Sequence, residues 1–193
     1  MTSRVLLLLP VLTISAFAQQ NLIVNGGFDA PNDPMKGWNR DYAWTENSFY
    51  VGNASRVSPV EQFSGQRQVV QLQKNGDAGT KIESILIPYE QGGKYRATLK
   101  VQGGLYRIYF SGYQWKPGIR PHSEPTLQEM RAVYRSKTEV GESASWKTVT
   151  LDIPGTEASE LSLQHLRKVR FMTLYIWFLG TGHVDDVSVV RLK

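Results

Sequence analysis

The chain has 193 residues, of which 41% are hydrophobic and 20% are charged, with 22 Lys and Arg against 17 Asp and Glu and no cysteine. The absence of cysteine excludes a disulfide framework and lipid attachment through an N-terminal cysteine. The basic surplus is scattered, and its densest group is Lys94, Arg96, Lys100 and Arg107. Because a continuous Lys/Arg stripe is the minimum footprint of a nucleic-acid-binding protein, we expect no nucleic-acid partner.

The first 18 residues have the three parts of a secretory signal peptide. Arg4 precedes an apolar run from Val5 to Ile14, and Ala16-Phe17-Ala18 has the small-x-small form of a cleavage site. The run is too short to span a bilayer comfortably, and no second apolar segment is long enough for a membrane anchor. We therefore predict a signal peptide at 1–18 and a secreted, periplasmic or cell-surface protein. Residues 19–193 suffice for one well-packed domain and are too few for two.

Apolar and polar residues alternate with a period of two along most of the chain, as in β-strands with one buried face. In residues 95–102 the odd positions are apolar and the even positions are polar, as an antiparallel strand with one solvated face requires. Similar segments, separated by Gly, Pro, Ser and Asn clusters, lie at 69–73, 82–87, 105–113, 146–153 and 169–178. We predict an all-β fold, a two-sheet jelly-roll β-sandwich with one or two short helices in long loops, because an open sheet would leave its edges unprotected.

Two further segments, one at each end of the predicted domain, suggest that the termini meet. Residues 21–29, Asn-Leu-Ile-Val-Asn-Gly-Gly-Phe-Asp, are predicted to begin as a short apolar strand that Asn-Gly-Gly breaks. Residues 182–190 are rich in β-branched residues, with Asp185 and Asp186 near the start. We expect these first and last strands to lie side by side.

The strand pattern is interrupted at 116–145, and about thirty residues are too many for a plain loop in a compact domain. Thr126-Leu127-Gln128-Glu129 has the form of a capping box, and Leu127, Met130 and Tyr134 follow at helical spacing. We predict a short helix here and a second helical turn at 157–166. Both are expected to cover an end of the sandwich.

Several motifs occur in the order and spacing of a known family. They are Asn-Leu-Ile-Val-Asn-Gly-Gly-Phe-Asp at 21–29, Gly37-Trp38, Ser64-Gly65, Ile87-Pro88 with Gly93-Lys94-Tyr95, Trp146-Lys147-Thr148-Val149 and Val184-Asp185-Asp186-Val187-Ser188. The ordered set covers nearly all of 19–193 and resembles carbohydrate-binding modules of the four, nine and twenty-two group. The resemblance implies a galactose-binding-domain-like jelly roll that binds a polysaccharide or oligosaccharide without cleaving it, often with a structural calcium. The chain differs in having Asp29 in place of the usual Glu, and in the length of its 116–145 insert.

A calcium site is also suggested by the residues themselves. Asp185 shares parity with Val187 and Val189, so its carboxylate points toward the inner edge of the sandwich and needs a partner. Calcium takes roughly six to eight oxygen ligands, and the glycine turn beside Asp29 can present backbone carbonyls. The resemblance implies Asp29 and Asp185 as side-chain ligands, with backbone oxygens from Gly27 and from the region of Gln66. The alternative is that these acids cap turns or pair with Lys or Arg.

Sugar binding calls for aromatic faces that stack on the apolar side of a pyranose, with polar groups beside them for its hydroxyls. The odd positions of 105–115 share one face, and so do the odd positions of the predicted strand at 169–178. The candidate carbohydrate-binding residues are Arg107, Tyr109, Tyr113, Trp115, Tyr175 and Trp177. For each aromatic the alternative is burial in the core, which we favour for Trp38.

Two other function classes stay open. One is a glycan-active jelly-roll enzyme that hydrolyses glycosyl bonds, or a module associated with one. Such an enzyme needs two carboxyl groups facing each other across a cleft, and the strand-borne acids are Glu83, Asp152, Asp185 and Asp186. The other is a structural or adhesive surface protein that binds another protein. Our leading hypothesis is a secreted, monomeric, non-catalytic polysaccharide-binding module.

Overall fold

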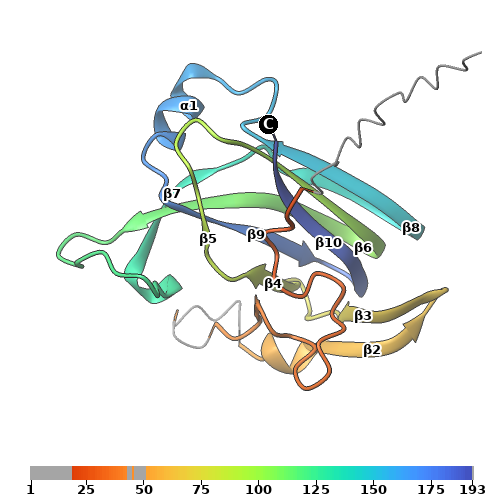
Figure 1. Cartoon of the computed structure of the whole chain (residues 1–193). Coiled ribbons are helices and arrows are strands. Elements are labelled where there is room, and N and C mark those ends of the chain that lie inside the picture. Colours follow the sequence, from red (N-terminus) through yellow and green to blue (C-terminus); the bar gives the residue numbers. More distant parts are fainter. Residues whose placement is uncertain (1–18, 43–44, 46–50, 193) are drawn as a thin grey trace, which may run out of the picture.

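The longest strand, β6 (Lys94–Trp115), takes part in two sheets and organises the rest of the chain (Figure 1). The computed structural model describes residues 19–42, 45 and 51–192, so the predicted signal peptide lies outside the described residues. Odd-numbered residues of β6 are buried from Tyr95 to Val101, and even-numbered residues from Tyr106 to Phe110. The predicted strands at 95–102 and 105–113 are therefore one continuous strand whose inner face changes parity at Gly103 and Gly104.

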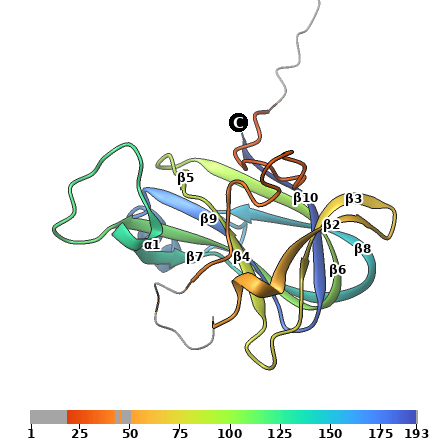
Figure 2. The ribbon, with the colours of Figure 1, turned by 90° about the horizontal axis from the view of Figure 1, so that it is seen from below.

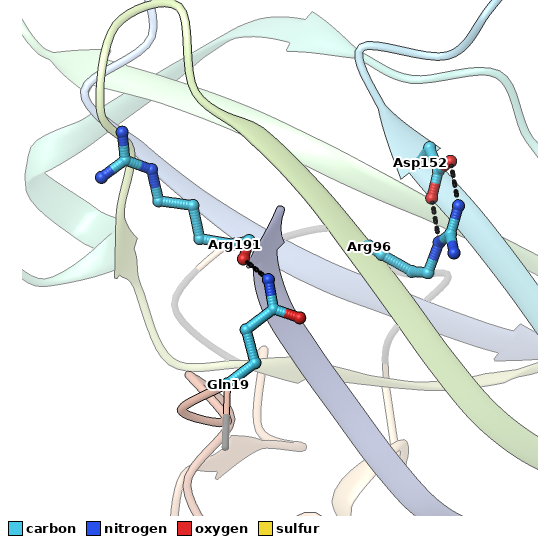
Figure 3. Close-up of polar contacts among 4 residues, drawn as sticks. All are labelled: Gln19, Arg96, Asp152 and Arg191. Carbon is cyan, nitrogen blue, oxygen red and sulfur yellow. Dashed lines mark hydrogen bonds and ion pairs between the residues drawn. The ribbon is translucent and has the colours of Figure 1, made fainter. Parts of the chain in front are cut away.

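The first half of β6 lies between β10 (Gly182–Leu192) and β8 (Glu139–Ile153), both antiparallel to it. β3 (Gln66–Leu72) pairs with β10, and β2 (Val57–Phe63) pairs with β3. The strand order of this first sheet is thus β2-β3-β10-β6-β8. Arg96 of β6 faces Asp152 of β8 and forms a bidentate ion pair with its carboxylate, at 2.8 Å from Nε and 2.9 Å from Nη2 (Figure 3).

The second half of β6 pairs on one side with β9 (Phe171–Phe178). On its other side it pairs first with the start of β8 and then, from Ser111, with β7 (Met130–Arg135). β4 (Thr80–Ser84) pairs with β9, and β1 (Trp38–Asn39) pairs with β4. β5 (Ile87–Pro88) also pairs with β9. The two sheets are halves of one curled, ten-stranded antiparallel network that is continuous through β6. The predicted all-β jelly-roll sandwich is confirmed.

The core lies between the two halves. It holds the inner faces of β6, β9 and β10, including Leu99, Ile108, Leu174, Ile176 and Val189, all with no exposed surface. The short helix α1 (Glu160–Leu166) adds Leu166 to this core and lies at the opposite end of the fold from the β2–β3 hairpin (Figures 1 and 2). The predicted helical turn at 157–166 is confirmed. None of the helices in the described part of the chain is long and apolar enough to cross a membrane.

The prediction of a helix within 116–145 is largely wrong. Only a three-residue 3-10 turn, η4 (Leu127–Glu129), follows Thr126, whose backbone N–H donates to Glu129 Oε2 at 2.9 Å as the capping box predicts. Met130 and Tyr134 then lie in strand β7, and β8 begins as early as Glu139. A spacing of four residues suits a strand as well as a helix, and pairing with the second half of β6 favours the strand.

The prediction that residues 21–29 begin with a strand is also wrong, although the expected contact between the termini is confirmed. This segment consists of turns and bends. It is joined to β10 by Leu22 N–H, which donates to Val189 O at 2.7 Å, and by Asn21 Oδ1, which accepts from Val189 N at 2.9 Å. Gln19 Nε2 also donates to Arg191 O (Figure 3). Because the Asn21 side chain takes a backbone partner of β10, a regular ladder does not form.

A glycine is required where β6 passes from one sheet to the other. Gly103 has φ +128°, and a Cβ there would lie 2.4 Å from Thr181 O, which accepts from Gly104 N at 3.0 Å. We predict that Gly103→Ala lowers the free energy of unfolding by about 3 kcal/mol, measured by urea denaturation. Gly76→Ala is the matched control, because Gly76 has φ +53° with nothing near its Cβ position. An equal loss in both variants would contradict the steric role of Gly103.

Candidate functional site

Side chains of four neighbouring strands meet on the outer face of the second sheet. Cross-strand register places Arg107 of β6 opposite Trp177 of β9, and Lys81 of β4 on the other side of Trp177. In the next row, Tyr109 of β6 is opposite Tyr175 of β9. Residues that are directly opposite in an antiparallel pair share a face, so these side chains form two adjacent rows across the sheet. The alternate residues of β9, Met172, Leu174, Ile176 and Phe178, are fully buried in the core.

Three aromatic rings form a platform within these rows. The rings of Tyr109 and Tyr175 stack with centroids 4.4 Å apart and an interplanar angle of 21°. Trp177 is held by its indole N–H, which donates to Ala78 O at 2.9 Å. A Cβ on Gly79 would lie 2.4 Å from the indole, so only glycine leaves room for Trp177 in this position. Trp177 is therefore fixed by neighbouring backbone, and Tyr109 and Tyr175 pack on each other. These three residues are called the aromatic platform.

Cationic side chains lie over the same rings. The guanidinium carbon of Arg107 is 5.0 Å from the Trp177 ring centroid, and that of Arg135 is 5.2 Å from the Tyr109 ring centroid. Lys81 Nζ is 3.6 Å from the Tyr42 centroid and 5.0 Å from the Tyr175 centroid. At these distances the rings attract the cations through cation–π interactions, which also orient the cations.

A groove of about 470 Å³ runs over the platform. Its lining residues come from β6, β7, β9, the β7–β8 turn, the start of β8 and the segment before β4: Ala78, Arg107, Tyr109, Arg135, Thr138, Val140, Tyr175 and Trp177. Four of the six predicted carbohydrate-binding residues are among them. Arg135, Thr138 and Val140 were missed because they lie in 116–145, where we expected no strand. Recognising the alternation at 130–135 would have placed Arg135 on this face.

Tyr113 lies on the same face of β6 but takes part in a buried polar network beyond the groove. Its hydroxyl donates to Glu83 Oε1 at 2.6 Å, and Thr173 Oγ1 donates to the same oxygen at 2.6 Å. Burial is the main cause that raises the pKa of Tyr113, with the charge of Glu83 next. Burial also lowers the pKa of Lys81 to about 8, against the opposing effect of Glu83. Glu83 is 4% exposed and is held by hydroxyl donors.

Trp115 lies farther along β6 and does not line the groove. Its ring contacts Phe171 edge-on at 5.8 Å and His122 at 4.9 Å. His122 Nε2 is 2.9 Å from Glu129 Oε1, and this contact is the main cause that lowers the pKa of Glu129 to about 2. Trp115 thus anchors the loop after β6. Trp38 is 7% exposed and packs on Phe28, which confirms the core position we favoured for it.

The residues predicted to hold calcium lie together where the first residues of the chain meet β10. Asp185 is 3% exposed, and its Oδ1 accepts from Asp186 N at 2.7 Å. The side-chain amide of Gln66, turned to donate, lies 3.1 Å from Asp185 Oδ2. A Cβ on Gly27 would lie 3.8 Å from the Asp29 carboxyl carbon, so the glycine backbone borders that carboxylate.

Among the described residues, no Lys or Arg side chain forms an ion pair with Asp185. Burial is the main cause that raises the pKa of Asp185 to about 6, and the charges of Asp186 and Asp29 add to the rise. The hydrogen bond from Asp186 N–H and the charge of Lys100, whose Nζ pairs with Asp186 Oδ2 at 2.7 Å, oppose it. The carboxylates of Asp29 and Asp185 and the backbone of Gly27 offer oxygen ligands of the kind that a hard cation takes, whereas the Gln66 amide, turned to donate, presents its N–H groups to Asp185. The described residues contain no group of three or more His, Cys, Asp or Glu side chains placed to share a metal.

His183, Asp185 and Asp186 all lie in strand β10. Asp185 is buried while its neighbour Asp186 is exposed, so the two carboxylates do not face each other across a cleft. His183 lies in β10 and is 5% exposed. Its ring stacks on Phe63 at 3.5 Å, and its Nε2 is 3.0 Å from Gln71 Nε2. Burial, the main cause, lowers the pKa of His183.

Comparisons with known proteins place the fold. No protein-family model matches the sequence, and none of the curated proteins does. The enzymatically active domain of bacteriophage CBA120 tailspike protein 4 is similar to 89% of the chain, with a TM-score of 0.53 and 9% identity. The chain spans 21% of that protein, and at this identity the similarity shows the fold alone.

Two carbohydrate-binding modules also align with most of the chain. A CBM4 structure matches 88% of the chain and 99% of its own length, with a TM-score of 0.46 and 16% identity. TmCBM61 in complex with β-1,4-galactotriose matches 90% of the chain and 99% of its own length, with a TM-score of 0.49 and 15% identity. At these TM-scores the two similarities carry no weight for function. The function must be argued from the groove.

Proposed function

We propose that the chain binds a polysaccharide or oligosaccharide in the groove over Tyr109, Tyr175 and Trp177. The observation that carries the proposal is the aromatic platform, whose rings line an open groove on a sheet face instead of filling the core. Ligand sites in proteins are typically concave and aromatic, with a few polar groups that fix orientation. A pyranose ring fits such a platform because its axial C–H groups form an apolar face while its hydroxyls project around the rim.

The polar groups of the groove suit the rim of a sugar. The guanidinium groups of Arg107 and Arg135 donate to ring and hydroxyl oxygens, and the Thr138 hydroxyl can donate or accept. The lining residues of the groove come from β6, β7, β8 and β9, so a glycan bound there would contact all four strands. In this proposal the protein is a non-catalytic module, exported through the segment 1–18.

Calcium is proposed as a structural ion of this module. Asp29 and Asp185 would hold it through their carboxylates, with oxygens from Gly27 and Gln66. When bound, the ion would neutralise carboxylates that lie close together at the edge of the core. The support is the burial of Asp185 beside a second acid, with the nearest lysine engaged by Asp186. The ion would therefore tie the N-terminal turns to β10, away from the groove.

The test is retention of the protein in native gels that contain a panel of plant and microbial polysaccharides, run with and without calcium. We expect slower migration with at least one glycan and no release of reducing ends from any of them. Reducing ends that appear with the native protein and vanish with Glu83→Gln would instead indicate a hydrolase. No retardation on any glycan, together with tight capture by a protein partner, would support an adhesive role and overturn the proposal.

A further inference from the structure

The charged side chains that line the groove are all positive. Its eight lining residues include two arginines and no aspartate or glutamate. Arg107 and Arg135 are both exposed, and neither forms an ion pair or a hydrogen bond with any residue that the structure describes. Three other exposed arginines are paired, Arg96 with Asp152, Arg167 with Glu160 and Arg191 with Glu90, whereas the exposed Arg67 and Arg120 form no ion pair with a described residue. The two groove arginines thus keep their N–H donors available for a ligand.

The arginines are placed on both sides of the stacked tyrosines. Arg107 precedes Tyr109 by two residues on the same face of β6. Arg135 of β7 is opposite Ser111, which follows Tyr109 by two residues. Tyr109 therefore lies between the two guanidinium groups, and a sugar that packs against the edges of the Tyr109–Tyr175 pair has one arginine on each side.

The aromatic contacts also orient the two guanidinium groups for binding anions. Each guanidinium lies over an aromatic ring, which restricts its plane without using its N–H groups. A planar guanidinium binds a carboxylate or a sulfate through two parallel hydrogen bonds. A groove that binds a neutral glycan would instead be expected to contain carboxylates, which accept hydrogen bonds from the sugar hydroxyl groups. Lys81 adds no free charge here, because it is 6% exposed and close to Glu83.

We propose that the ligand is an acidic glycan, whose carboxylate or sulfate groups bind to Arg107 and Arg135 while its sugar rings pack against the aromatic platform. This inference rests on the proposed function and narrows the substrate class of the same groove. The surplus of basic residues in the whole chain, a formal charge of +5, favours the approach of such a polyanion.

Two matched pairs of polymers test the inference by gel retardation and calorimetry. The first pair is polygalacturonate and the same polymer after reduction of its carboxyl groups. The second is a sulfated galactan and its desulfated form. We expect the charged member of at least one pair to bind at least tenfold more tightly than the neutral member, with affinity that falls as salt rises. Which pair responds identifies carboxylate or sulfate as the bound group.

Three variants test whether the preference for the charged polymer comes from the groove arginines. Arg107→Gln and Arg135→Gln should each weaken binding of the acidic polymer about tenfold, the loss expected for a charge-assisted hydrogen bond. Arg67→Gln is the control, because Arg67 is an exposed residue of β3 in the other sheet and its loss changes the net charge equally. Equal weakening in all three variants would mean nonspecific attraction and would overturn the inference.

The remaining outcomes separate this inference from the proposed function. Equal binding of charged and neutral members would overturn the acidic ligand and leave glycan binding intact. No binding to any of the four polymers, or to the neutral glycans of the wider panel, would overturn both. Tighter binding of single-stranded DNA than of every glycan would also overturn both, because stacked bases can occupy an aromatic, basic groove as well.

Discussion

Calcium added to metal-free protein is expected to raise the melting temperature by about 10 °C. An ion present at a thousandfold excess over its dissociation constant, and bound only by the folded state, stabilises that state by about 4 kcal/mol. For a domain of this size each kcal/mol corresponds to about 2–4 °C. The physical reason is that Asp185, buried beside Asp29, gains a direct cationic partner. Thermal unfolding followed by circular dichroism, with a chelator and then with calcium, measures the shift.

Two neighbouring residues provide a matched pair of variants for this prediction. Asp185→Asn should abolish the response to calcium and leave the chelated protein at least as stable as the parent, since a buried charge is removed. Asp186→Asn should keep the response, because Asp186 is exposed and pairs with Lys100. An unchanged melting temperature on adding calcium to the parent protein would end the metal hypothesis, and a response that survives Asp185→Asn would move the ion elsewhere.

The predictable part of the fold follows from alternation within single segments. The two parities of β6, odd before Gly103 and even after Tyr106, are visible in the sequence because each half buries its own apolar residues. What the sequence does not show is that the halves join, since a Gly-Gly pair also marks an ordinary turn. The N-terminal segment fails for a related reason. The side chain of Asn21 competes for the backbone partners that a strand would use.

The candidate site was likewise predictable only in part. Arg107, Tyr109, Tyr175 and Trp177 could be predicted because alternation assigns them to one face, and the pairing of β6 with β9 brings these faces together. Trp115 and Tyr113 share that face but differ in their neighbours, the His122 loop and Glu83, which alternation does not specify. Arg135 was missed because the short strand β7 depends on long-range pairing with β6, a contact that local propensity does not encode.

Loss of Trp177 is expected to have the largest effect on glycan binding. Trp177→Ala should weaken affinity by about 30- to 100-fold, because a large aromatic residue at the centre of a ligand surface commonly contributes about 2–3 kcal/mol. The groove would also lose the ring over which Arg107 lies. Isothermal titration calorimetry with the glycan that gives the strongest gel retardation measures the change. Near-ultraviolet circular dichroism and the melting temperature verify that the sandwich still folds.

Trp115→Ala is the matched control, since it removes a tryptophan from the same face of the sheet outside the groove. Its affinity should stay within about twofold of the parent, while the loop that contacts Trp115 loses a packing partner. Gly79→Ala provides an independent test, because its methyl group would displace the indole of Trp177 without changing the tryptophan itself. We expect a loss approaching that of Trp177→Ala. Equal losses in Trp115→Ala and Trp177→Ala would show that the ligand extends along β6 beyond the groove, and unchanged binding in both would place it on another surface.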